Sequence, residues 1–156
     1  MFEEIEIFNE FFPVYSWWSS IMILQMMTLI WFTGRIRVKT ETIHSDEDKK
    51  WIKNKNVELH IDGGGHPDLD HIRSAHFTDL KTMMPYLLIA PIWLTTSPTH
   101  FSANIILRIF PICKLIDTIL YMKLNKNLTA VPAIFLTVCY VVIFYIGTST
   151  LLHYLY

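Results

Sequence analysis

The sequence predicts an all-α integral membrane protein, a bundle of four transmembrane helices in a single domain that covers residues 1–156. Hydrophobic residues make up 52% of the chain and charged residues 17%, and the mean hydropathy is +0.33. These values depart from those of soluble domains in the direction of lipid. Four stretches also reach the length of roughly 17–25 apolar residues that a helix needs to cross a bilayer.

The first two predicted spans flank a polar loop. The first covers about residues 13–33, carries no charge and has tryptophans near both ends, where they anchor a helix at the membrane interfaces. The second covers about residues 80–96. Its helix is expected to begin near residue 68, because Pro67 stiffens the entry and Asp68 or Asp70 can cap the free backbone amides.

The last two predicted spans differ in charge. The fourth, about 128–154, is uncharged, whereas the third, about 101–122, contains Arg108, Lys114 and Asp117. Such groups cost about 2.5–3.5 kcal/mol each in lipid, so they are expected to face the protein interior or water. Lys114 and Asp117 either neutralise each other and hold helices together, or line an anion-binding site.

The positions of lysine and arginine predict the orientation of the chain in the membrane. Outside the predicted third span, these residues occur between 34 and 81 and in the turn 123–127, whereas residues 1–33, the turn 96–100 and the C-terminal tail have none. Because positive charge favours the cytosolic side, both termini are expected in the lumen and the loop 34–67 in the cytosol. The glycosylation sequon at Asn127 would then lie in the cytosol and stay unmodified.

Several classes of function are disfavoured by composition. A net charge of −1 without a basic aromatic patch gives no indication of a nucleic acid partner. Cys113 and Cys139 lie in apolar stretches without a CxxC neighbour, which favours buried reduced thiols over a disulfide. No metal site is expected, because the histidines between 34 and 80 lack metal-ligand spacing. These histidines are His44, His60, His66, His71 and His76.

Ionisable side chains gather where the second span is expected to leave the cytosol, in the stretch IRSAHFTDLKTMMPY at 72–86. Arg73 and His76 are three residues apart, as are His76 and Asp79, so each pair shares a helix face. Lys81 follows within the same stretch. The group is either a collar of solvated charges at the interface or a polar pocket at the cytosolic membrane surface.

The stretch HPDLDHIRSAHFTDLKTMMPY at 66–86 resembles the signature of the MAPEG superfamily, the membrane-associated proteins in eicosanoid and glutathione metabolism. RIFPICKLIDTILYM at 108–122 is similar to the superfamily's third-span motif. The resemblance covers about 34–156 and is strongest to the microsomal glutathione transferases and prostaglandin E synthases. It implies a homotrimer in the endoplasmic reticulum membrane, with a mitochondrial membrane as the alternative, and glutathione bound between subunits near the cytosol.

The match to the family motifs is partial. The residues that agree are His76, Asp79, Pro85, Arg108, Thr118 and Tyr121. The departures are Ser74 for Arg, Thr78 for Asn, Lys81 for Glu, Lys114 for Arg and Asp117 for His. Lysine gives a point charge where arginine grips a carboxylate with two hydrogen bonds. Lys81 also meets the ammonium of glutathione with its own sign, so the site is chemically altered.

The resemblance implies a role for each candidate residue. Tyr121 and Lys126 would support the glutathione thiolate as catalytic residues. The cofactor-binding residues would be Arg73, His76, Asp79, Lys81, Lys114 and Asp117, among which Arg73, His76 and Lys114 hold carboxylates and Asp79 orients them.

Two classes of function follow from these expectations. The first is a membrane-bound glutathione transferase or peroxidase that acts on lipophilic electrophiles, which the matching residues favour. The second is a catalytically silent scaffold or accessory subunit of a membrane assembly, which the lost arginines and glutamate favour. A specialised eicosanoid isomerase is a third candidate, and the same lost arginines count against it.

Overall fold

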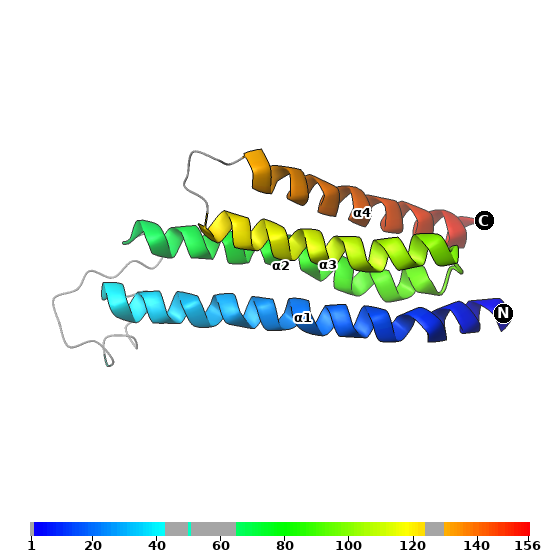
Figure 1. The fold of residues 1–156 in the computed structure, drawn as a ribbon, viewed down its shortest axis with the longest axis horizontal. Helices are drawn as coiled ribbons and strands as arrows, with labels where there is room; N and C mark the ends of the chain where they lie inside the picture. Colours follow the sequence, from blue (N-terminus) through cyan, green and yellow to red (C-terminus); the bar gives the residue numbers. More distant parts are fainter. Residues whose placement is uncertain (1, 43–49, 51–64, 124–129) are drawn as a thin grey trace.

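The computed structural model describes residues 2–42, 50, 65–123 and 130–156, and these residues form four long helices (Figure 1). Helix α1 spans Phe2–Thr40, α2 spans Pro67–Leu94, α3 spans His100–Lys123 and α4 spans Ala130–Leu155. No strand occurs within these residues. The all-α prediction with four helices is confirmed.

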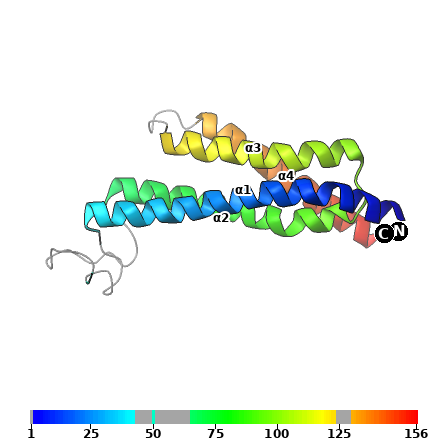
Figure 2. The ribbon, with the colours of Figure 1, turned by 60° about the horizontal axis from the view of Figure 1, so that its bottom comes forward.

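The four helices are antiparallel and lie in three layers. Helices α2 and α3 contact each other in the middle, α1 packs on both from one side, and α4 packs on both from the other. Within the described residues α1 and α4 do not touch. Figures 1 and 2 show the N- and C-terminus at the same end of the bundle, as expected for four antiparallel helices. We call this the terminal end, and the opposite end the loop end.

Helix α1 is longer than the predicted span 13–33, because its acidic first residues and the start of the predicted loop are also helical. At 1.5 Å per residue its 39 residues measure about 58 Å, well beyond the roughly 30 Å of the bilayer core. The helix ends where Glu41 takes a left-handed conformation, with φ of 51°, and Thr42 N donates to Arg37 O at 3.2 Å. This bond closes a Schellman motif.

The start of α2 agrees with the prediction to within one residue, but its cap does not. The N-cap is His66, whose Nδ1 accepts a hydrogen bond from Asp68 N at 3.3 Å. The N-cap residue is therefore His66 and not Asp68. Both carboxylates lie in the first turn, where negative charge offsets the positive end of the helix dipole.

Two of the helices are long and apolar enough to cross a membrane by length and composition, Glu6–Thr40 of α1 and Val131–Leu155 of α4. Their outward faces carry many exposed large apolar side chains, which in water would be unfavourable over such an area. These two helices indicate membrane association. Crossing by α2 and α3 as well stays a prediction.

The apolar core fills the half of the bundle nearer the terminal end. It is built from the second half of α2, the first half of α3, and residues of α1 and α4. At its centre the fully buried rings of Tyr86 and Phe110 are stacked, with centroids 3.8 Å apart and planes 7° apart. Cys113 and Cys139 are both buried and free, which confirms the prediction of reduced thiols.

Candidate functional site

A buried ion pair joins α2 to α3 just beyond the apolar core. Lys114 is fully buried, and its Nζ lies 2.8 Å from Asp79 Oδ1 and 2.7 Å from Asp117 Oδ2. The two carboxylates are also buried, with 2% of Asp79 and 5% of Asp117 exposed. Distances this short are typical of charge-assisted hydrogen bonds. Lys114 therefore bridges a carboxylate on its own helix and one on α2.

Helix α1 joins this pair through an amide. Gln25 Nε2 donates to Asp79 Oδ2 at 2.9 Å and to Thr118 Oγ1 at 2.7 Å. The Thr118 hydroxyl lies 2.9 Å from Asp79 Oδ2, and donates to it. Asp79 thus accepts from an ammonium, a hydroxyl and an amide on two neighbouring helices. We call Gln25, Asp79, Lys114, Asp117 and Thr118 the buried ion cluster.

The buried ion cluster brings one amino group of lysine against two aspartate carboxyl groups. Its ammonium, carboxylates, hydroxyl and amide N–H groups pair with one another across α1, α2 and α3, whereas Gln25 Oε1 is buried without a partner within the described residues. Two alternatives were expected for Lys114 and Asp117, an ion pair within the protein or an anion-binding site. The single chain shows the ion pair. A cofactor-binding role for Asp79, Lys114 and Asp117 stays a prediction.

Of the other candidate residues on α2, Arg73 and His76 lie toward the loop end and Lys81 lies near the middle of the helix, and all three are more open than Asp79. Arg73 and His76 are half-buried, and Lys81 is exposed with its Nζ 4.1 Å from the centroid of the Phe77 ring. Such a contact holds the ammonium by cation–π attraction. His76 Nδ1 is a buried atom without a hydrogen-bond partner in the described part of the chain. Within the described residues, no hydrogen bond or ion pair joins Arg73, His76 and Lys81 to one another.

Tyr121 lies near the end of α3 and contacts α2 through both its ring and its hydroxyl. Its ring is stacked on His71, with centroids 4.5 Å apart and planes 8° apart. The hydroxyl donates to Ser74 Oγ at 3.3 Å, and Tyr121 O lies 2.9 Å from His71 Nε2. The second predicted catalytic residue, Lys126, lies outside the described residues. Sequence reasoning did not single out His71 as a neighbour of Tyr121.

Gln25 was also missed, although the sequence holds a signal for it. It is the one amide side chain in the predicted span 13–33, which is otherwise apolar apart from hydroxyl groups. An amide in lipid needs a partner on another helix. That requirement could have placed α1 against the charged residues of α2 or α3.

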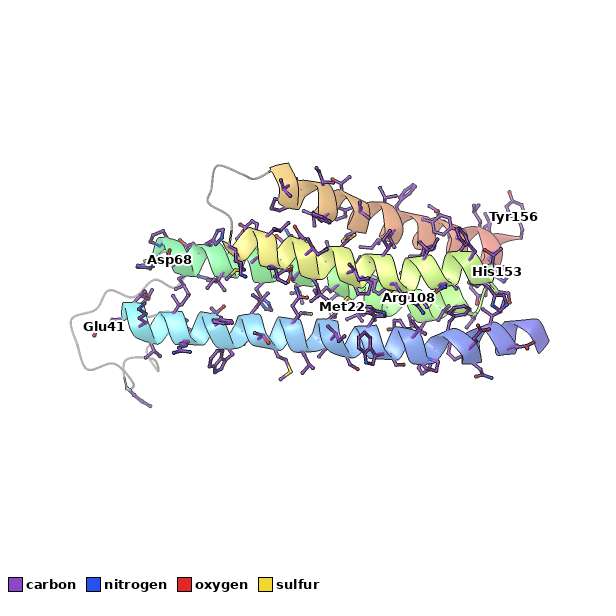
Figure 3. All side chains as sticks on the ribbon, in the orientation of Figure 1. Met22, Glu41, Asp68, Arg108, His153 and Tyr156 are labelled. Atoms are coloured by element: carbon purple, nitrogen blue, oxygen red, sulfur yellow. The ribbon has the colours of Figure 1, made fainter. Side chains whose placement is uncertain are left out.

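Arg108 stands apart from all these groups. It lies on α3 in the half nearer the terminal end, where Figure 3 labels it. It is exposed on the single chain, and among the described residues it has no hydrogen bond or ion pair. An arginine on a lipid-facing surface is costly unless a second protein surface or water meets it.

The fold and the buried charges describe an α-helical membrane-associated protein. Among known proteins, the chain is 21% identical to prostaglandin E synthase of Equus caballus over 110 residues, which are 70% of this chain and 69% of that one. It is 22% identical to prostaglandin E synthase of Bos taurus over 124 residues, 76% and 74% of the two chains. No protein-family model matches the chain. The similarity supports a distant relation to the MAPEG superfamily and does not extend to a specific activity.

Proposed function

We propose that the chain is a glutathione-dependent membrane protein of the MAPEG type, a transferase or peroxidase that acts on lipophilic electrophiles. The MAPEG-like motifs and the similarity to prostaglandin E synthases support the proposal. The observation that carries it is geometric: Arg73, His76 and Tyr121 stay outside the buried ion cluster, half-buried, and so remain open to a ligand at the loop end. This end is the cytosolic side in the proposed orientation.

Each of these residues offers a contact that glutathione can use. The guanidinium of Arg73 presents paired N–H groups to a carboxylate. His76 Nδ1, which lacks a partner in the described chain, is a polar atom that a ligand or a second chain can satisfy. The Tyr121 hydroxyl can donate to the thiolate, which is the nucleophilic form of the cofactor. Lys126 would add positive charge near the thiolate.

Lys81 defines how this site would differ from that of the family. It is exposed beside Phe77, so its ammonium is not used in the buried ion cluster. At about 4 Å and an effective dielectric constant of 20, like charges repel by about 4 kcal/mol. We therefore place a carboxylate of glutathione, and not its ammonium, near Lys81.

We also propose that the functional unit is a homotrimer in the endoplasmic reticulum membrane, with both termini lumenal and a mitochondrial membrane as the alternative. The support for assembly is Arg108, which is exposed and unpaired within the described chain and would gain a partner from another copy. Chemical cross-linking in native membranes tests the assembly. A ladder that stops at three subunits is expected, and a monomer alone contradicts it.

Isothermal titration of the detergent-solubilised full-length protein with glutathione tests the function directly. Binding is expected, and Arg73→Ala should weaken it by about tenfold or more, because hydrogen bonds to charged groups contribute about 1.5–3 kcal/mol. Arg35→Ala is the matched control, since Arg35 is an exposed arginine that lies over Trp31 on α1. An absence of binding at millimolar glutathione contradicts the proposal.

A second candidate function is a catalytically silent scaffold or accessory subunit in a membrane assembly. The observation that favours it is the buried ion cluster, which uses Asp79, Lys114 and Asp117, three of the predicted cofactor-binding residues, to hold the helices. Affinity purification from native membranes distinguishes the two. Stoichiometric co-purification of other subunits without glutathione binding supports the scaffold, and an isolated active homotrimer contradicts it.

An eicosanoid isomerase is the third candidate, and the names of the two similar proteins, both prostaglandin E synthases, favour it. It would use the same thiol and the same fold as the transferase. Assays with an eicosanoid substrate and with a simple lipophilic electrophile, run side by side, separate the two activities by product.

A further inference from the structure

A second polar contact joins α2 to α3, separate from the buried ion cluster and nearer the loop end. The imidazole of His71 lies parallel to the ring of Tyr121, with centroids 4.5 Å apart and planes 8° apart. Its Nε2 also lies 2.9 Å from the carbonyl oxygen of Tyr121. His71 and Tyr121 are half-buried and Ser74 beside them is exposed, so a ligand can reach the group.

The contact between His71 and the Tyr121 carbonyl shows which of the two groups donates the hydrogen bond. The Tyr121 carbonyl lies in the last described turn of α3, which spans His100–Lys123. A carbonyl only accepts, and His71 Nε2 therefore carries the proton in this contact. The single His71 ring thus donates to the Tyr121 carbonyl and covers one face of the phenol. Two contacts from one residue restrict the rotation of the Tyr121 side chain.

The hydroxyl of Tyr121 is held much less firmly than its ring. Its hydrogen bond to Ser74 Oγ is 3.3 Å long, beyond the 2.5–3.0 Å of good O–H···O bonds. Hydrogen bonds of reacting groups are often long without ligand and shorten when the ligand binds. The ring is therefore oriented in advance, while the proton of the hydroxyl stays available to another acceptor.

We propose that His71 is a positioning residue for Tyr121, holding the phenol so that its hydroxyl donates to an anionic sulfur of the bound ligand. The inference rests on the proposed function, because that sulfur is the thiolate of glutathione. A donor already oriented before binding stabilises developing negative charge without the cost of being ordered at that moment. His71 acts only through Tyr121 and does not touch the ligand.

The experiment measures the ultraviolet absorbance of the glutathione thiolate bound to the full-length protein in detergent. His71→Phe keeps a stacked ring and removes the N–H donor, whereas His71→Gln keeps an N–H donor and removes the stack. Each is expected to lower the bound thiolate fraction by about threefold to tenfold, from the usual strength of such contacts. The dissociation constant of glutathione, set by its carboxylates, should change less than about twofold. Tyr121→Phe removes the hydroxyl itself and should therefore give the largest loss of bound thiolate.

A matched control exists at the opposite end of the bundle. His153 is an exposed histidine whose ring meets that of Tyr154 at 5.1 Å, so His153→Phe changes the same kind of residue beside a tyrosine. It should leave the thiolate unchanged. Thermal unfolding of every variant separates loss of folding from loss of positioning. The two His71 variants remove different contacts, so the test needs only one of them to fold.

The outcomes separate the two proposals. Wild-type protein that binds no glutathione contradicts the proposed function, and the inference with it. Normal glutathione binding with a wild-type thiolate signal in His71→Phe and His71→Gln overturns the inference alone. A reduced signal at an unchanged unfolding temperature, with little change in affinity, supports it, because a purely structural role would lower stability and leave the thiolate unaffected.

Discussion

Replacing Lys114 by methionine tests the buried ion cluster as the element that holds α1, α2 and α3 together. Methionine fills a similar volume and removes the charge. In the wild type the Lys114 ammonium is fully buried and contacts Asp79 at 2.8 Å and Asp117 at 2.7 Å. In the variant, two buried carboxylates would face each other without a cation.

The size of the effect follows from that geometry. Removing one partner of a buried ion pair costs about 3–5 kcal/mol, because the remaining charge is left in a medium that solvates it poorly. Here two carboxylates lose their cation, so the upper part of the range is expected. For a chain of this length, 1 kcal/mol corresponds to about 2–4 °C in Tm, and Tm should fall by about 8–20 °C.

Thermal unfolding of the full-length protein in detergent, followed by circular dichroism, measures this change. Lys123→Met is the matched control, since Lys123 is an exposed lysine on the same helix. The double variant Lys114→Met with Asp117→Asn removes one of the two stranded charges and should recover part of the loss. A Tm of Lys114→Met within about 2 °C of wild type would refute the reasoning, because it would mean the cluster adds nothing to stability.

Three further predictions concern α1, the subunit contact and the topology. Gln25→Met removes a donor from Asp79 and should lower the free energy of unfolding by about 1.5–3 kcal/mol, measured by the same thermal unfolding. Arg108→Leu removes the charge that needs a partner from another copy, and light scattering in detergent should show a shift from trimer toward monomer. Asn127 should carry no sugar in microsomes, whereas a sequon introduced into the turn 95–99 should gain one, visible as a mass shift.

Each of these predictions has a control and a contradicting result. Ser20→Ala is the control for Gln25→Met, since the Ser20 hydroxyl bonds only within α1, at 2.8 Å to Ser16 O. Wild-type stability in Gln25→Met would show that the amide contributes nothing to helix contact. An unchanged trimer in Arg108→Leu would remove the support for its role in assembly. A glycan on Asn127 would contradict the predicted orientation.

Helix boundaries could be predicted where the chain carries local signals, and not elsewhere. Pro67 opens α2 within one residue of the predicted start, because proline fits the first turn of a helix. The end of α1 depends on Glu41 in a left-handed conformation, which is rare for that residue and has no sequence signature. The prediction also took the apolar stretch 13–33 for the whole helix, although hydropathy marks the lipid-facing part of a helix and not its ends.

In the candidate site, too, some contacts could be predicted from the sequence and others could not. The Lys114–Asp117 contact could be predicted, because residues three apart meet on one helix. The approach of Asp79 and Gln25 could not, since it depends on how α1 and α2 are rotated about their axes against α3. For the same reason, the stacking of the Tyr121 ring on His71 could not be predicted.

The pairing between α2 and α3 has a consequence for how the chain is made. Both helices carry ionisable side chains within their predicted spans, and only the short turn 95–99 separates them. In the proposed four-span arrangement, Asp79 would enter lipid uncompensated until Lys114 had been synthesised. The two segments would therefore leave the translocation channel together as a helical hairpin, and a ribosome stalled between them would leave α2 waiting in the channel.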